Sequence, residues 1–417
     1  MKIPILFPIV IILLTLSFCS CDNDEDHLTP DPNPSDITSP AELTAVLNDV
    51  YDNADVPGFA ISIIKDDVVL YQRSFGKADI ENNKDYTNLT TQPIGSISKT
   101  FVAAAIVKAI EEGHLTLEMD INHILPIEVK NPKQPDAIIK VKHLVTHTSG
   151  LIDHNPSYFK AYHILPGEDM STEGAELLNN GLGIPQRESM PLEDFLAEYY
   201  LEDGDLYAMD NFASTAPGSS WSYSNIATSL AAYLVEAATG IPFKEYVYTH
   251  ILEPLGMTHT AYDISNLNSE RLAKLYWGQD IALPNYANDS YPDGSINTCN
   301  EDMSKYLMDM MRGAQGQSTT LFSTAGYDML FDALLPEGLT PPELGDNQGV
   351  FWVLQDGYIN HTGSDPGTTC NLLFDANGSV GYALMTNMDA STEEHESAYF
   401  NLAAQVHDAF LEFVQNN

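Results

Sequence analysis

The sequence predicts an α+β fold in which one antiparallel sheet, built from both chain ends and flanked by helices, lies beside an all-α lobe. Strand patterns occur in residues 58–75 and again in residues 349–387, whereas the chain between them shows mostly helical patterns and long loops. The chain has 417 residues and no internal repeat, so we expect one large unit with two lobes. The α/β lobe takes about residues 41–95 and 346–417, and the helical lobe takes about residues 96–345.

The first folded elements are a helix and a hairpin. Residues 41–54 place apolar side chains at helical spacing. Residues 58–65 and 68–75 read as two strands joined by Asp66 and Asp67, a pair typical of hairpin turns. The first helix and these strands supply the N-terminal contribution to the sheet layer.

Two apolar helices follow in the middle of the chain. One opens at Ser96 and stops before Gly113. The other covers residues 225–239 and is stopped by Gly240 and Pro242. The first carries an apolar stripe formed by Val102, Ala105, Ile106, Ala109 and Ile110.

Strands return near the C-terminus, over residues 349–355, 357–363 and 368–387. The turns between and within them are Asp356-Gly357 and Asn377-Gly378. Residues 391–394 read as a capping box for a last helix, which has Leu402, Val406, Phe410 and Phe413 on one side. These strands and this helix complete the sheet layer.

Residues 1–21 read as a lipoprotein signal peptide. Lys2 precedes the apolar run 3–18, which is short for a membrane span and suits a secretory signal. The end of this run resembles the cleavage site of bacterial lipoproteins, so Cys21, which follows the small Ser20, is predicted to carry the lipid. Cleavage by an ordinary signal peptidase, without a lipid, is the alternative.

The acidic, Pro-rich residues 22–40 read as an extended tether to a folded domain at 41–417. We therefore expect an exported lipoprotein, periplasmic or on the cell surface, that touches the membrane only through its N-terminal lipid. Lys plus Arg number 18 against 59 Asp plus Glu, a formal charge of −41. Such a chain repels the phosphates of nucleic acid, so nucleic-acid partners are excluded.

Ser96 and Lys99 stand three residues apart at a predicted helix start, so their side chains can meet on one helix face. A serine hydroxyl becomes a nucleophile when a neighbouring base takes its proton, and a lysine of lowered pKa can be that base. Backbone N–H groups at the same helix start can stabilise an oxyanion. The alternative is an N-cap serine followed by a solvated lysine, because Ser-x-x-Lys occurs by chance about once in a chain of this length.

Two further groups of residues could take part in catalysis or substrate binding. Tyr223 and Asn225 stand immediately before a helix, where the alternatives are a core tyrosine and an N-cap asparagine. His361, Thr362 and Gly363 end a predicted strand, where the alternative is a surface histidine on a hairpin.

In this order the three groups resemble the Ser-x-x-Lys, Tyr-x-Asn and Lys/His-Thr-Gly motifs of the serine β-lactamase/DD-peptidase family, which includes class C β-lactamases, D-alanyl-D-alanine carboxypeptidases and related esterases. Four other segments are similar to stretches of that family: HLVTHTSGL, PGSSWSYSN, EPLGMTHT and YPDGSINTCNEDMSKYL. The resemblance is collinear over about residues 41–415.

The resemblance implies a role for each motif residue. Ser96 would be the nucleophile, Lys99 its base and Tyr223 the proton shuttle. Asn225 would hold Lys99 or the substrate amide, and His361, Thr362 and Gly363 would line the substrate side of the strand. The backbone N–H groups of Ser96 and Ser364 would form the oxyanion hole.

No metal or cofactor is expected. His143 and His147 stand four apart, as metal ligands on a helix do, but no Glu follows His143 as it does in zinc proteases, and in the resembling segment the two histidines are structural. Cys299 and Cys370 either pair in the oxidising export environment or remain buried free thiols. The resemblance places both near the catalytic strand.

The function implied is a serine hydrolase that forms an acyl-enzyme on Ser96 and acts on a small-molecule or peptide substrate, namely D-alanyl peptides or small esters. A class C-type β-lactamase and a catalytically silent surface binding protein are the alternatives. β-Lactamases of this kind usually carry a lysine where this chain has His361. If His361 binds a substrate carboxylate as imidazolium, kcat/KM for that substrate has to fall above about pH 6–7.

Overall fold

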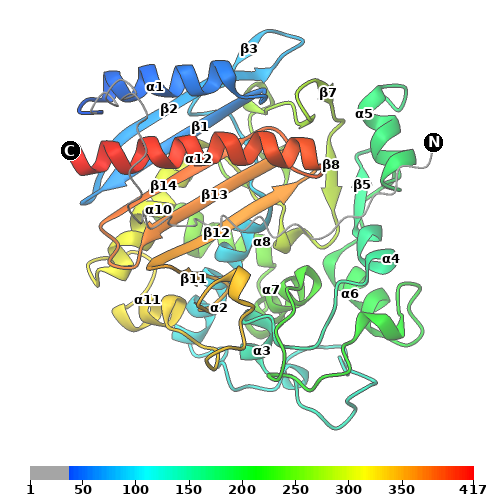
Figure 1. Ribbon diagram of the computed structural model, residues 1–417. Coiled ribbons are helices and arrows are strands. Elements are labelled where there is room, and N and C mark those ends of the chain that lie inside the picture. The colour runs from blue at the N-terminus through cyan, green and yellow to red at the C-terminus, as the bar shows by residue number, and fades with distance from the viewer. Residues whose placement is uncertain (1–36) are drawn as a thin grey trace, which may run out of the picture.

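The computed structural model describes residues 37–417 and contains an eight-stranded antiparallel sheet in the order β10-β11-β12-β13-β14-β1-β2-β3 (Figure 1). The strands are β1 Gly58–Lys65, β2 Val68–Asp79, β3 Lys84–Asp85, β10 Asn347–Gln348, β11 Val353–Gln355, β12 Tyr358–Asp365, β13 Thr368–Asp375 and β14 Val380–Thr386. The two chain ends meet where β1 pairs with β14, from Phe59 opposite Thr386 to Lys65 opposite Val380. The predicted α+β fold, with one sheet built from both chain ends, is confirmed.

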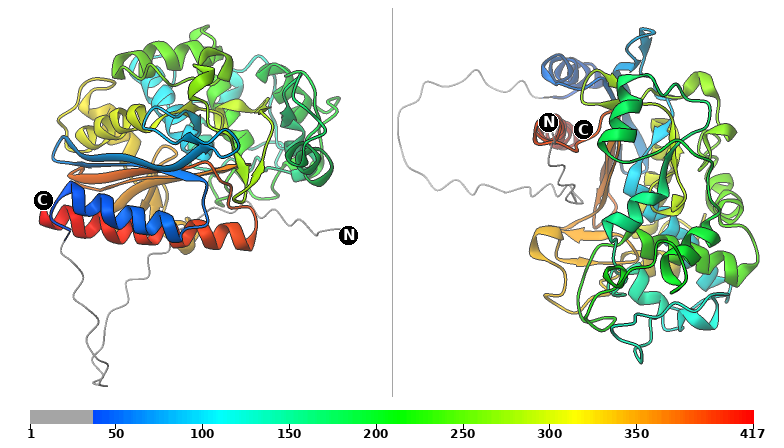
Figure 2. Two further views of the ribbon diagram at one scale, coloured as in Figure 1. Left: turned by 90° about the horizontal axis from the view of Figure 1, so that it is seen from above. Right: turned by 90° about the vertical axis from the view of Figure 1, so that its right-hand side faces the viewer.

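Helices α1 (Pro40–Asn53) and α12 (Glu393–Asn416) lie side by side on one face of the sheet (Figures 1 and 2). Their inward side chains form a buried apolar layer with the sheet, to which α12 contributes Leu402, Val406, Phe410 and Phe413. The backbone N–H of Ile37 donates to Glu412 Oε1 at 2.8 Å, so the last residues of the predicted tether belong to the fold. The predicted signal peptide, Cys21 and the rest of the tether lie outside the described residues.

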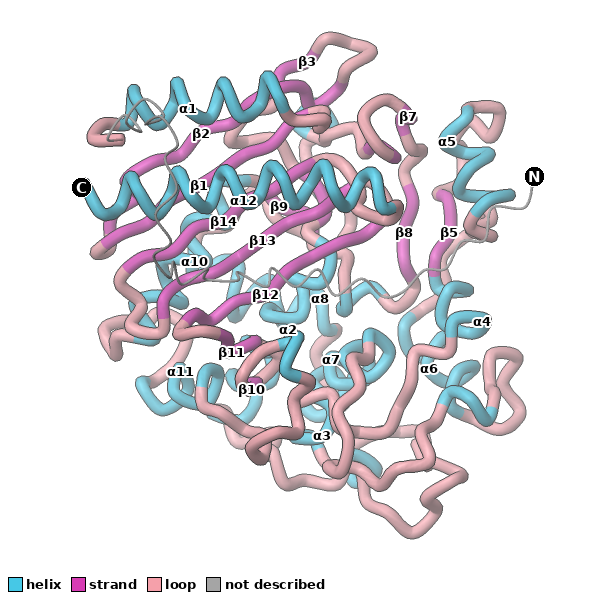
Figure 3. Tube along the Cα trace, viewed as in Figure 1, coloured by secondary structure: helices cyan, strands magenta, loops and turns pink. Residues whose placement is uncertain are grey.

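The opposite face of the sheet carries the helical part of the chain (Figure 2). Helix α10 (Asn300–Ala314) packs against β14 and β1, and the largely apolar helices α2 (Ser98–Glu111) and α7 (Asn225–Thr239) pack against each other. The shorter helices are α3 Val141–Val145, α4 Asn155–Tyr158, α5 Glu173–Glu176, α6 Leu192–Tyr200, α8 Phe243–Val247, α9 Glu253–Leu255 and α11 Thr324–Phe331. Long loops join them (Figure 3). The boundaries of the two lobes remain predictions.

Three small ladders tie these loops together. They pair β4 (Gln92–Pro93) with β9 (Asn297–Thr298), β5 (Tyr162–Ile164) with β8 (Tyr286–Asn288), and β6 (Tyr276–Trp277) with β7 (Ile281–Ala282). Within residues 37–417 no single helix has the length and apolar composition to cross a membrane, although the bent pair 225–239 and 243–255 reaches that limit when counted together.

Three local predictions need correction. Ser96 lies in a short 3₁₀ turn, η1 (Gly95–Ile97), that leads into α2, rather than in the α-helix itself. The strand predicted at 349–355 is reduced to β11, because Phe351 has φ +59° and donates its N–H to Val145 of the helical part. The last helix is capped by Thr392, whose side chain accepts from the N–H of His395, and not by a box starting at Ser391.

Cys299 and Cys370 are both buried free thiols. Burial raises the pKa of each thiol to about 12, which keeps both protonated at neutral pH. Of the two alternatives left open by the sequence, the structure shows free thiols and not a bridge.

Gly363 lets strand β12 approach the 3₁₀ turn that carries Ser96. A Cβ at this position would overlap the Ile94 carbonyl oxygen and lie 3.2 Å from the Ile97 nitrogen. We expect Gly363→Ala to lower the free energy of unfolding by about 1–3 kcal/mol, because the backbone on both sides cannot give way. The matched control is Gly181→Ala, where the nearest atom is 3.9 Å away. Urea unfolding is the measurement, and equal midpoint shifts for the two variants would contradict this account.

Candidate active site

Lys99 is fully buried and uses every proton of its ammonium group. Its Nζ donates to Ser96 Oγ at 3.0 Å, to Asn225 Oδ1 at 2.6 Å and to the carbonyl oxygen of Asp293 at 2.7 Å. The predicted meeting of Ser96 and Lys99 is therefore present in the structure. The alternative of a solvated lysine is wrong, and the N-cap position of α2 is Ile97.

Asn225 is the first residue of α7, and a buried carboxylate holds it in place. Asp153 accepts from the backbone N–H of Asn225 at 2.8 Å and from that of Ile226 at 3.0 Å. It also accepts from Ser224 Oγ at 3.1 Å, and Ser224, not Asn225, caps the helix. Burial raises the pKa of Asp153 to about 6. Asn225 is thus free to turn its side-chain oxygen toward Lys99.

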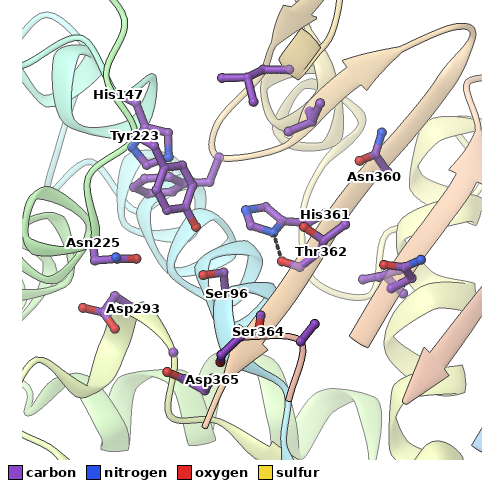
Figure 4. A pocket seen from close by; sticks show the side chains of 18 of the residues that line it. Ser96, His147, Tyr223, Asn225, Asp293, Asn360, His361, Thr362, Ser364 and Asp365 are labelled. Carbon is purple, nitrogen blue, oxygen red and sulfur yellow. Dashed lines mark hydrogen bonds between the residues drawn. The ribbon is translucent and has the colours of Figure 1, made fainter. Parts of the chain in front are cut away.

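Tyr223 lies beside the ammonium group, with its ring centroid 4.9 Å from Lys99 Nζ. The ring of His147 packs against it at a centroid distance of 4.5 Å (Figure 4). His147 has φ +54°, and its Nδ1 accepts from the N–H of Ser224. Burial raises the pKa of Tyr223, although Lys99 opposes this, so the phenol is a proton donor at neutral pH.

The two histidines considered as metal ligands point to different neighbours. Helix α3 ends at Val145, so His143 and His147 do not share a helix face. His143 Nδ1 accepts from the N–H of Lys140. Within residues 37–417, no group of three or more His, Cys, Asp or Glu side chains is arranged to hold a metal ion.

The edge of strand β12 passes close to Ser96. Gly95 has φ +52°, and a Cβ there would lie 2.6 Å from the backbone nitrogen of Ser364. The two backbone N–H groups predicted for the oxyanion hole, from Ser96 and Ser364, thus belong to adjoining segments. Pairing of β11 with β12 ends at Asn360, so β11 leaves the edge of residues 361–365 uncovered.

His361 faces the site with a neutral ring. Its Nδ1 lies 2.6 Å from the carbonyl oxygen of Thr362, so this nitrogen carries the proton and Nε2 offers a lone pair. Burial and the charge of Lys99 lower the pKa of His361 to about 3. Burial therefore disfavours the imidazolium that would bind a substrate carboxylate near neutral pH, and the role of His361 stays a prediction.

Ser96, Tyr223, Asn225 and His361 line a cleft of about 200 Å³ between β12 and the helical part (Figure 4). Its other walls are mainly aromatic and include Tyr158, Phe159, Tyr162, Trp221 and Phe351. Thr362 also lines it, as predicted.

Sequence reasoning missed three buried or half-buried acids near Lys99, namely Asp153, Asp293 and Asp365. Asp293 accepts from the hydroxyls of Tyr158 and Ser290, and Asp365 accepts from Tyr162. The positions of Asp293 and Asp365 inside motif segments, YPDGS and HTGSD, were the available signal.

The sequence profile of the Beta-lactamase family matches residues 43–407. The chain belongs to this family. Penicillin-binding protein 4* of Bacillus subtilis (strain 168) is 24% identical over 360 residues, which cover 81% of this chain and 69% of that protein. Esterase EstB of Burkholderia gladioli is 30% identical over 222 residues, covering 52% of this chain and 51% of the esterase. The shared family is thus one of serine hydrolases that includes penicillin-binding proteins and esterases.

The fold is also similar to that of the octameric penicillin-binding protein homologue from Pyrococcus abyssi. The TM-score is 0.65 at 23% identity, and the match covers 88% of this chain and 77% of that structure. The predicted resemblance to the β-lactamase/DD-peptidase family is confirmed. The roles of individual residues in the Beta-lactamase-family site remain predictions.

We expect Tyr223→Phe and Lys99→Met each to lower kcat for a small ester by about 10²-fold or more, the usual scale for a lost acid–base group. Tyr399→Phe is the matched control, since this tyrosine is fully buried in the layer under α12, away from the cleft. Its kcat should equal that of the wild type. Steady-state kinetics and thermal melts measure both effects, and a large drop in Tm with normal kcat would show that Tyr223 is structural.

We expect no rise or fall of kcat/KM caused by titration of His361 between pH 5 and 8, because its pKa of about 3 keeps the ring neutral throughout. Between pH 5 and 8 the substitution His361→Gln should change kcat/KM by the same factor for a neutral ester and for an ester that carries a carboxylate, and this factor should not depend on pH. The pH profiles of kcat/KM for both esters are the measurement. A fall centred between about pH 6 and 7 for the carboxylate ester alone, lost in His361→Gln, would show that the imidazolium does bind it.

Proposed function

We propose that the chain is a serine hydrolase that forms an acyl-enzyme on Ser96 and acts on D-alanyl peptides or small esters. The observation that carries this proposal is the buried Lys99 Nζ, which lies 3.0 Å from Ser96 Oγ and is held by Asn225. A hydroxyl in contact with a lysine, at the mouth of a cleft and beside backbone N–H groups, is the arrangement that acyl transfer needs.

The proposed reaction has two halves. The reaction requires Lys99 as the neutral amine, which has given up the proton that its ammonium form donates to Ser96 Oγ. As Ser96 Oγ attacks the carbonyl carbon of the substrate, its proton passes to this amine, and the oxyanion is held by the N–H groups of Ser96 and Ser364. Tyr223 gives its proton to the leaving group as the C–O or C–N bond breaks, and Lys99 restores that proton. Water then attacks the acyl carbon and gives a proton to Tyr223 and Lys99. The bond from the acyl carbon to Ser96 Oγ breaks as this proton passes to Oγ, which restores Ser96 and releases the acid.

The class C-type β-lactamase is the weaker alternative. Penicillins carry a carboxylate, but His361 is neutral at working pH. No Lys or Arg occurs among the described residues that line the cleft. A silent binding protein is also disfavoured, because burying an ammonium group is costly and binding alone does not require it next to Ser96.

The proposed setting is outside the cytoplasm, with a lipid on Cys21 as the membrane attachment. The apolar run after Lys2 and the cysteine context at its end support this. The net charge of −41 supports a small-molecule or peptide substrate rather than nucleic acid.

The test of the function is covalent labelling. Intact mass spectrometry after exposure to a fluorophosphonate should show one adduct per chain, and peptide mapping should place it on Ser96. Ser96→Ala should take up none. Ser98→Ala is the matched control, because Ser98 is the buried neighbour whose hydroxyl donates nothing to Lys99 and instead accepts from the N–H of Ile296. Labelling that persists in Ser96→Ala would contradict the assignment.

A further inference from the structure

The two ends of the cleft differ in chemistry. Tyr223, His147 and His361 lie on one side of Ser96, and Asp293 and Asp365 lie on the other (Figure 4). Because Tyr223 is the proposed donor to the leaving group, the Asp365 end receives the acyl part of the substrate.

Asp365 is the last residue of β12 and lines the cleft. Its Oδ1 accepts from Tyr162 Oη at 2.8 Å, and this is the one hydrogen bond to the carboxyl group from residues 37–417. Its Oδ2 lies 2.9 Å from where a Cβ on Gly294 would be, and that point is 3.9 Å from the carbonyl carbon of Gly95. The second oxygen therefore lies over the Gly294 backbone, close to the segment that carries Ser96.

Aromatic rings lie near this carboxyl group. Tyr158, Phe159 and Tyr162 all line the cleft, and the ring of Tyr162 lies 6.1 Å from each of the other two. The Tyr158 hydroxyl donates to Asp293 at 2.8 Å. Ring faces next to a carboxylate attract a cation, and quaternary ammonium groups in particular are bound by such surroundings.

No group in the described cleft offers a charge to a substrate carboxylate. Its lining residues include the carboxyls of Asp293, Asp356 and Asp365 and no Lys or Arg. Burial lowers the pKa of His147 and of His361, the two histidines on the Ser96 side of the sheet, so both rings are neutral. The three protons of Lys99 are already donated.

We propose that Asp365 and the rings of Tyr158, Phe159 and Tyr162 form a site for an ammonium group on the acyl part of the substrate. The acyl donors of this enzyme are then cationic esters or amides. Donors whose acyl part ends in a free carboxylate are turned over poorly. This inference rests on the proposed acyl transfer at Ser96 and narrows its substrate class.

The test compares 4-nitrophenyl esters of three acids. The acyl groups are 4-(trimethylammonio)butanoyl, its neutral isostere 5,5-dimethylhexanoyl, and the glutaric half-acid. Each kcat/KM is divided by the rate of hydroxide hydrolysis of the same ester, which removes intrinsic reactivity. The cationic ester should exceed the neutral one by about tenfold or more, and the carboxylate ester should be the poorest.

Asp365→Asn keeps an acceptor for Tyr162 and removes the charge, so the ratio of cationic to neutral kcat/KM should fall to near one. Asp356→Asn is the matched control. It removes the same charge from an exposed residue in the turn before β12, at the opposite end of this strand from Asp365, where φ is +51° and Asn is tolerated. This variant should keep the wild-type ratio. A wild-type ratio near one, or a ratio that Asp365→Asn leaves unchanged, would overturn the ammonium site.

The pH dependence gives a second readout. Burial and the nearby Asp293 raise the pKa of Asp365 to about 7, so its carboxylate forms as pH rises from about 6 to 8. The ratio of cationic to neutral kcat/KM should rise over the same range and be flat in Asp365→Asn. The ionisable groups that face Asp365 are Tyr158, Tyr162, Tyr286, Asp293 and Lys99.

Binding separates this inference from the proposed function. In Ser96→Ala, calorimetry should show tighter binding of the cationic ester than of its neutral isostere, and the added change Asp365→Asn should abolish the difference. If the variant binds in this way but the wild type hydrolyses neither ester, the proposed acyl transfer at Ser96 is contradicted and the ammonium site is not. If the wild type hydrolyses the neutral ester through Ser96 but does not prefer the cationic ester, the ammonium site is contradicted and the acyl transfer is not.

Discussion

Burying the ammonium group of Lys99 forces distant parts of the chain together, because each of its protons needs an acceptor once water is excluded. The acceptors are Ser96 on the turn before α2, Asn225 at the start of α7 and the backbone carbonyl of Asp293. Removing any one acceptor leaves a charged donor without a partner in an apolar interior. Ser96, the helical part and the loop before α10 are therefore held in one arrangement by a single cation.

Several buried carboxyl groups lie near the ammonium group of Lys99, but they do not form direct ion pairs with it. The buried carboxyl groups near Lys99 are held mainly by neutral donors: backbone N–H groups for Asp153, and tyrosine or serine hydroxyls for Asp293 and Asp365. Burial raises the pKa of all three carboxyls. The described lining of the cleft thus has acidic groups at one end, which ionise at higher pH than free carboxyls do, and no Lys or Arg.

The sheet provides the rigid side of the site. Strand β12 is paired with β13 along its whole length, and its open edge runs past Ser96. Two glycines allow the approach, Gly95 through a left-handed conformation and Gly363 through the lack of a side chain. Because the sheet joins both chain ends through β1 and β14, the position of β12 relative to Ser96 depends on the complete fold.

Much of this could be predicted from the sequence by itself, because helix spacing, hairpin turns and caps depend on neighbours a few residues apart. The first hairpin, helices α2 and α7 and the pairing of both chain ends in one sheet followed from such patterns, and motif order indicated the family. Patterns did not reveal that β11 is short, since the Val145 carbonyl that holds Phe351 comes from a distant helix. They also could not show that His361 is neutral or that Asp153, Asp293 and Asp365 surround Lys99. Burial and long-range hydrogen bonds set those properties, and both arise only when the chain is folded.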